Sequence, residues 1–225
     1  MCGRSPTFRQ AAEIFGAAPI SESPLLEGGE KTISTRNPHW RVFCAIELPL
    51  AVRERVQSHI VRLRESVPQA RASWNRDDKL HLTIKFLGDI TIDRVPALSL
   101  AAERAVSGLK PFALAAEGCG AFPERGQPRV LWIGVDDGGG GLTRLHQQLE
   151  EECAGQDFAR EQRSFRPHLT IARVRHSQAA SELATAHREL GFPRLEFQVN
   201  ELIVIRSELG SAGSRYTEIS RHALL

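Results

Sequence analysis

One four-residue word occurs twice in this chain of 225 residues, and its spacing constrains the fold more than any other feature. His-Leu-Thr-Ile stands at residues 81–84 and again at residues 168–171. A flanking segment repeats at nearly the same offset, since Arg41-Val-Phe matches Arg129-Val-Leu. Such a period is too long for a solenoid of short repeats. The sequence therefore predicts two copies of one unit, packed about a pseudo-two-fold axis.

Each copy alternates strands with helices. Apolar residues spaced by three or four positions between Val52 and Leu63 indicate one face of a helix, which Pro68 ends. The same kind of pattern predicts strands over 41–48, 70–75, 80–87, 112–122, 129–135, 168–174, 195–207 and 215–221, and helices over 50–66, 93–107, 142–153 and 178–190. The predicted fold class is α+β: a bilobal, duplicated unit of two antiparallel sheets with outer helices and a cleft between the lobes.

The first 39 residues differ from the rest of the chain. They are rich in Pro, Gly, Ser and Thr, which favour turns and loops over packed structure. Residues 1–39 are therefore predicted to be a poorly ordered N-terminal extension, and residues 40–225 to form the two-lobed domain.

Composition limits the classes of protein that this chain can belong to. Its 29 basic and 27 acidic residues give a net charge of +2, too balanced for a histone-like polyanion binder, although a local basic cleft remains possible. The four cysteines are scattered without a Cys-x-x-Cys pair, and no apolar run approaches the roughly 20 residues of a membrane span. With no secretion signal, we expect a cytoplasmic protein that does not bind membranes. A monomer is expected because the duplication supplies a paired site within one chain.

The repeated word carries the predicted chemistry. Side chains alternate between the two faces of a strand, so His81 shares a face with Thr83, and His168 with Thr170. Two imidazoles and two hydroxyls would then face one cleft. One imidazole can accept a proton while the other donates one, and hydroxyls can stabilise charge on phosphate oxygens. This arrangement suits phosphodiester cleavage and requires neither a metal nor another cofactor.

Two further residues are candidate phosphate contacts. Lys85 follows Thr83 by two positions and would share its face, and Arg166 precedes His168 by two. By the same alternation, Phe86 faces the core and Arg173 faces away from the histidines. The remaining histidines form no recognisable metal-binding set.

Five motifs in order resemble the 2H phosphoesterase superfamily, and within it the RNA 2′,3′-cyclic phosphodiesterases, also called 2′-5′ RNA ligases. They are Arg41-Val-Phe-Cys-Ala-Ile-Glu-Leu-Pro, His81-Leu-Thr-Ile-Lys-Phe-Leu-Gly, Gly120-Ala-Phe-Pro, Pro128-Arg-Val-Leu-Trp-Ile-Gly and Arg166-Pro-His-Leu-Thr-Ile-Ala-Arg. The resemblance covers about residues 41 to 221. It implies hydrolysis of RNA ends that carry a 2′,3′-cyclic phosphate to 2′-phosphomonoesters. It also implies that His81 is the proton donor and His168 the proton acceptor.

Other functions remain open. Within the superfamily, the chain could act as a 2′-5′ RNA ligase or on another cyclic or 2′,5′-linked nucleotide. A protein that binds RNA ends without turnover belongs to a different class, but the presence of both histidines argues against it. A zinc enzyme would need three or four ligands close together, and the spacing offers no third ligand beside the histidine pair.

Overall fold

The computed structural model describes residues 38–175, 179–210 and 213–225, so residues 1–37 of the predicted extension lie outside the described residues. The strands are β1 (His39–Glu47), β2 (Ala72–Trp74), β3 (His81–Thr91), β4 (Phe112–Phe122), β5 (Val130–Asp136), β6 (His168–Val174), β7 (Leu195–Val199), β8 (Glu201–Gly210) and β9 (Gly213–Ala223). The helices are α1 (Leu50–Ser66), α2 (Val95–Val106), α3 (Gly141–Gly155) and α4 (Ala179–Leu190), with short 3-10 turns at Asp77–Lys79 and Ile92–Arg94.

The helix boundaries have local causes. At the start of α1, the carbonyl of Pro49 accepts hydrogen bonds from the N–H groups of Val52 and Arg53, at 3.0 and 3.1 Å. At the start of α3, the carboxylate of Asp137 accepts hydrogen bonds from the N–H groups of Leu142 and Thr143, at 3.0 and 2.7 Å. These contacts satisfy N–H groups that have no partner within their own helix.

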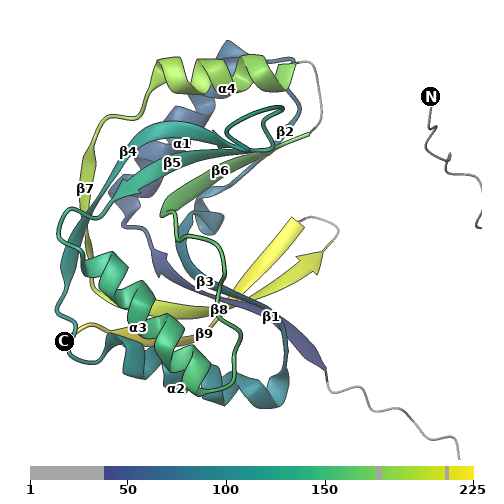
Figure 1. Cartoon of the computed structure of the whole chain (residues 1–225). Helices are drawn as coiled ribbons and strands as arrows, with labels where there is room; N and C mark the ends of the chain where they lie inside the picture. The colour runs from purple at the N-terminus through teal and green to yellow at the C-terminus, as the bar shows by residue number, and fades with distance from the viewer. Residues whose placement is uncertain (1–37, 176–178, 211–212) are drawn as a thin grey trace, which may run out of the picture. The chain divides into compact units, whose positions relative to one another are not determined.

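The strands form two antiparallel sheets (Figure 1). One sheet has four strands in the order β3-β1-β8-β9, and the other has five in the order β2-β6-β5-β4-β7. The prediction of one continuous strand over 195–207 is wrong. The segment is interrupted at Asn200, so that β7 is an edge strand of the five-stranded sheet and β8 belongs to the four-stranded one.

Each sheet combines strands from both halves of the sequence repeat. The first half supplies β1 and β3 to the four-stranded sheet but β2 and β4 to the five-stranded one. The helices are exchanged in the same way. Helices α2 and α3 pack together beside the four-stranded sheet, whereas α1 and α4 pack together beside the five-stranded sheet (Figure 1).

The apolar core lies between these helices and the sheets. Leu82 and Ile84 of β3 are buried in it, as are Leu169 and Ile171 of β6, which is the alternation expected from the repeated word. Within the described ranges, none of the helices is both long and apolar enough to cross a membrane.

Candidate active site

The two predicted catalytic histidines begin equivalent strands of different sheets. His81 is the first residue of β3 and His168 is the first residue of β6, and these two strands contact each other. The fold thus places one copy of the repeated word in each sheet, along the junction between the sheets.

Both imidazoles bind a backbone carbonyl two residues earlier in the chain. His168 Nδ1 lies 2.7 Å from the carbonyl oxygen of Arg166, and the His81 ring forms the corresponding hydrogen bond to the backbone of Lys79. Because a carbonyl can only accept, Nδ1 of His168 carries the hydrogen, and the lone pair of its neutral ring is on Nε2. The contact therefore fixes the tautomer and leaves Nε2 able to accept a proton from a substrate or a water.

Aromatic rings hold His81 in place. Its imidazole stacks on Phe43 with ring centroids 4.8 Å apart and meets the edge of Tyr216 at 5.4 Å. Burial lowers the pKa of His81 to about 4, and the hydrogen bond to Lys79 opposes this shift. In the free protein at neutral pH, this imidazole is therefore uncharged.

His168 is held by a different set of rings. Phe122 meets its imidazole edge-on at 5.2 Å, and Trp132 lies 6.4 Å from it, centroid to centroid. Gly120 leaves room for that indole, because a Cβ at this position would lie 2.0 Å from the Trp132 ring.

A β-bulge follows the threonine in each copy of the word. Ala45 pairs with Thr83 and Cys44 with Lys85, so one residue between them has no partner on β1. The same irregularity occurs in β6, where Trp132 pairs with Thr170 and the preceding residue of β5 pairs with Ala172. An extra residue reverses the alternation of faces beyond it.

The bulges make three predicted orientations wrong. Lys85 is 4% exposed and lies on the core side of β3, whereas Phe86 and Arg173 line a cavity together with His81 and Thr83. The prediction that Lys85 contacts phosphate assumed a regular strand. Because of the extra residue in the bulge, Lys85 does not share the face of His81 and Thr83, on which that prediction depended.

Lys85 instead forms a buried ion pair. Its Nζ lies 2.6 Å from Glu150 Oε1 on α3 and donates to the carbonyl oxygen of Ala159 at 2.9 Å. The second carboxylate oxygen of Glu150 accepts a hydrogen bond from the Glu161 N–H at 3.1 Å. Lys85 therefore connects β3 to α3 and the following loop.

Arg166 is placed beside His168 by its backbone rather than by its side chain. Its carbonyl orients the imidazole, while its guanidinium pairs with Glu124 at the surface. The side chains of Arg166 and Glu124 are both more than 60% exposed. An ion pair this exposed contributes about 0–1 kcal/mol and can be exchanged for another anion.

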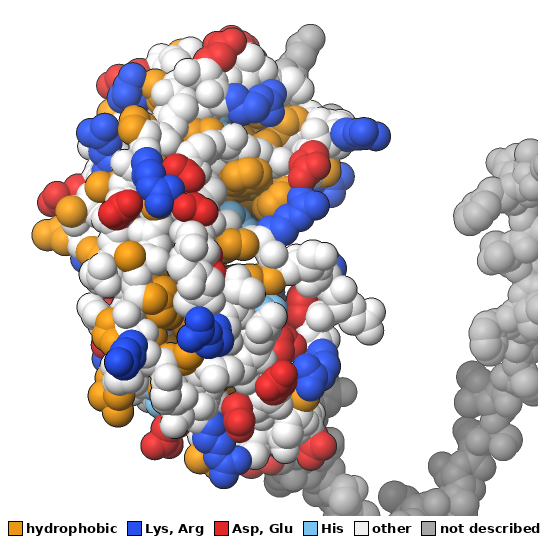
Figure 2. Space-filling model, turned by 60° about the vertical axis from the view of Figure 1, so that its left-hand side comes forward, with side chains coloured by type: hydrophobic (Ala, Val, Ile, Leu, Met, Phe, Trp, Pro, Cys, Tyr) orange, Lys and Arg blue, Asp and Glu red, His pale blue; other side chains and the backbone are white. Residues whose placement is uncertain are grey.

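The cavity beside His81 has a volume of about 830 Å³ and is strongly basic. We call it the catalytic cavity. Among the described residues, its lining includes His81 and Thr83 but not His168 or Thr170. It contains five cationic side chains and no acidic one; the cations are Arg41, Arg76, Lys79, Arg173 and Arg175. Figure 2 shows a hollow in the described surface with Lys and Arg side chains at its edge.

Sequence reasoning did not identify this group of cations. Arg41 of β1 pairs with Ser207 of β8, and its guanidinium lies 4.7 Å from the centre of the Phe86 ring. Only the strand order and the bulges bring these residues together, so no local sequence signal could have located them.

One group of potential metal ligands lies away from the repeated word. His59 of α1, His187 of α4 and Cys119 of β4 place their ligand atoms within 4.8 Å of one another, a grouping that the spacing of the histidines in the sequence did not predict. The His59 Nε2 and His187 Nδ1 atoms are 2.9 Å apart, and His187 Nε2 donates to the Trp132 carbonyl at 2.9 Å. A hydrogen bond between the rings accounts for their proximity, and the trio joins α1, α4 and β4 within the core.

Comparison with known proteins identifies the family of this chain. The profile of the 2′-5′ RNA ligase superfamily matches residues 52–211. The chain belongs to this superfamily. Two curated relatives are named RNA 2′,3′-cyclic phosphodiesterase. The Escherichia coli (strain K12) protein is 32% identical over 184 residues, and the Methanothermobacter thermautotrophicus protein is 30% identical over 182 residues. These alignments cover 82% and 80% of this chain and 96% of each relative.

Solved structures of the superfamily share the fold. The crystal structure of E. coli LigT complexed with 3′-AMP matches with a TM-score of 0.66 at 27% identity, covering 83% of this chain and 99% of that chain. The crystal structure of TT0787 of Thermus thermophilus matches with a TM-score of 0.68 at 25% identity, covering 82% of this chain and 97% of that chain. The resemblance inferred from the sequence and the predicted fold class are both confirmed.

Proposed function

We propose that this protein is an RNA 2′,3′-cyclic phosphodiesterase, which hydrolyses a terminal 2′,3′-cyclic phosphate to a 2′-phosphomonoester. The observation that carries the proposal is the pair of His-x-Thr strands, which lie in contact and bind carbonyls in the same way beside a basic cavity. The curated relatives with this activity in their names support the same reaction.

The two imidazoles would divide the proton transfers. Nε2 of His168 accepts a proton from water, whose oxygen attacks the phosphorus atom. The bond from phosphorus to the 3′ oxygen breaks, and His81 donates a proton to that oxygen. The product keeps the phosphate on the 2′ oxygen. This assignment of donor and acceptor follows the family pattern.

The acid role of His81 requires a protonated ring, whereas burial keeps the pKa of this ring near 4 in the free protein. A phosphate anion bound beside the ring favours its charged form. Substrate binding would therefore be coupled to proton uptake by His81.

The polar neighbours would bind the phosphate. The hydroxyls of Thr83 and Thr170 donate to its non-bridging oxygens, where charge develops. Arg166 joins them by exchanging its surface ion pair with Glu124 for the substrate.

RNA 3′ ends are the proposed partner, and residues 40–225 the proposed catalytic unit. A monomer suffices because one chain contributes both histidines. The described cysteines, Cys44, Cys119 and Cys153, are free thiols, which suits a reducing compartment such as the cytoplasm.

The test uses a short RNA that ends in a 2′,3′-cyclic phosphate, with EDTA present. We expect conversion to a 2′-phosphomonoester, and a loss of at least about a hundredfold in kcat for His81→Ala and for His168→Ala. His39→Ala removes an exposed histidine and serves as the matched control.

Other outcomes would overturn the proposal. Activity retained by both variants would exclude two-histidine catalysis. Binding of the RNA without turnover would indicate an end-binding protein, and activity lost in EDTA would indicate a metalloenzyme.

A further inference from the structure

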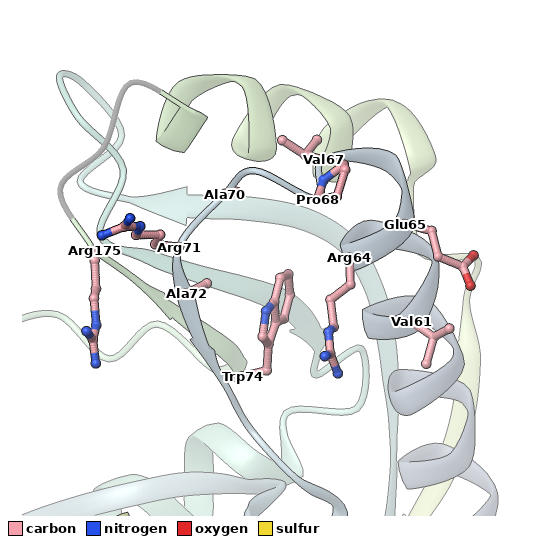
Figure 3. A pocket seen from close by; sticks show the side chains of 10 residues that line it. All are labelled: Val61, Arg64, Glu65, Val67, Pro68, Ala70, Arg71, Ala72, Trp74 and Arg175. Atoms are coloured by element: carbon pink, nitrogen blue, oxygen red, sulfur yellow. The ribbon is translucent and has the colours of Figure 1, made fainter.

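A second cavity adjoins the catalytic cavity on the outer side of β2. It lies between the C-terminal end of α1, the connection that follows it and β2, and its volume is about 830 Å³ (Figure 3). We call it the outer groove. Its lining includes Arg64 and Val61 of α1, Arg71 before β2, and Arg175 after β6.

The outer groove and the catalytic cavity share part of their lining. Trp74 and Arg175 line both of them. Trp74 ends β2, and the N–H of the next residue, Asn75, donates to the carbonyl of Ile171 in β6 at 2.8 Å. This hydrogen bond holds the backbone next to Trp74, whose indole lies at the boundary between the outer groove and the catalytic cavity.

Within the described part of the chain, the groove presents arginines that have no ionic partner. Among the described residues, no ion pair or side-chain hydrogen bond involves Arg64, Arg71 or Arg175, and Glu65 is the one acidic side chain in the lining. The N–H of Arg175 donates to the carbonyl of Arg71 at 2.9 Å, so these two side chains leave adjacent points of the backbone. Figure 3 shows them on one side of Trp74 and Arg64 on the other.

This combination of groups fits single-stranded nucleic acid. Guanidinium groups bind phosphates, and an indole provides a face on which a base can stack. The direction of the strand follows from the proposed reaction. A terminal 2′,3′-cyclic phosphate occupies both the 2′ and the 3′ oxygens, so the RNA can leave the catalytic cavity only toward its 5′ end.

We propose that the outer groove binds the single-stranded RNA immediately 5′ of the cyclic phosphate, with Arg64 and Arg71 contacting its phosphates. The inference rests on the proposed function. It specifies the substrate as the end of an RNA chain rather than a free cyclic nucleotide.

The experiment compares two substrates that share the same terminal nucleotide. One is a nucleoside 2′,3′-cyclic phosphate, and the other is a ten-nucleotide unstructured RNA with the same 3′ end. For the wild type, kcat/KM is expected to be higher for the long RNA and to fall with salt. The variant R64A/R71A should lose this preference while hydrolysing the cyclic nucleotide at the wild-type rate.

Salt dependence measures the number of contacts. Each phosphate contact on a single strand adds about 0.7 to the slope of log affinity against log salt concentration, so removing two contacts should lower the slope by about 1.4. The matched control is R62A, which removes an exposed arginine of α1 that does not line the groove. It should leave both the preference and the slope unchanged.

The results separate this inference from the proposed function. An unchanged length preference in R64A/R71A, or an equal loss on both substrates, overturns the role of the groove. Failure of the wild type to hydrolyse either substrate overturns the proposed function instead. In that case, fluorescence anisotropy with the same ten-nucleotide RNA still tests the groove, because R64A/R71A must then bind more weakly than R62A.

Discussion

Removing the ammonium group of Lys85 should destabilise the protein without weakening its affinity for substrate. The side chains of Lys85 and Glu150 are 2% and 11% exposed, and their charged atoms are 2.6 Å apart. The substitution Lys85→Met leaves the Glu150 carboxylate buried with the Glu161 N–H as its hydrogen-bond donor and His146 Nε2 3.9 Å from its Oε1 atom, but without the lysine charge. An uncompensated buried charge of this kind costs about 3–5 kcal/mol of unfolding free energy.

Removing both charges should restore much of the loss. In Lys85→Met/Glu150→Met the two new side chains are apolar and of similar length to the originals, and replacement of a whole buried pair is often neutral or stabilising. The double variant is therefore expected to be more stable than Lys85→Met alone. Such an order would show that the loss arises from the unpaired carboxylate.

Urea unfolding, followed by tryptophan fluorescence, gives the stabilities. Lys110→Met replaces an exposed lysine and serves as the control, with an expected change within about 0.5 kcal/mol. Kinetics with the cyclic-phosphate RNA, measured at a temperature where every variant is folded, should give a KM for Lys85→Met within about twofold of the wild type. Unchanged stability together with a tenfold rise in KM would refute the reasoning and would indicate that Lys85 contacts the substrate phosphate.

Two further predictions concern the glycine beside the indole and the buried histidines. Gly120→Ala places a Cβ 2.0 Å from the Trp132 ring, so kcat should fall and stability should drop by about 1–3 kcal/mol; Gly139→Ala, where a Cβ meets nothing within 4 Å, should leave the near-ultraviolet circular dichroism and kcat unchanged. Burial lowers the pKa of His59 to about 4 and lowers that of His187 too, so the unfolded chain takes up more protons than the folded one as the pH falls below 6.5. The melting temperature should therefore fall between pH 6.5 and about 4, less steeply in His59→Gln, and a constant melting temperature across this range would contradict the shifts.

The sequence predicted the site as far as the regular part of each strand extends. Alternation correctly placed Leu82 and Leu169 in the core and put Thr83 on the same face as His81. It failed two residues later, because a bulge follows the threonine in both copies. A bulge depends on how a strand pairs with its neighbour, and the isoleucines at positions 84 and 171 give no sequence signal for it.

The exchange of strands between the two halves could not be predicted from the sequence either. The repeat predicted two copies of a unit and the correct fold class, but a repeat in sequence does not specify which strands hydrogen-bond together. The interruption at Asn200 is a single residue between β7 and β8, and these two strands enter different sheets. Register, rather than propensity, determines this part of the fold.

That exchange has a consequence for how the chain is made. In the four-stranded sheet, β1 has β3 on one side and β8 on the other, and Arg41 pairs with Ser207. During synthesis from the N-terminus, β1 cannot pair with β8 until almost the entire polypeptide has been made. Pairing between such distant segments is slow, and unpaired strand edges expose a growing chain to aggregation. Neither half can therefore complete its folding ahead of the other on the ribosome, and the two copies of the repeated unit reach their native state together.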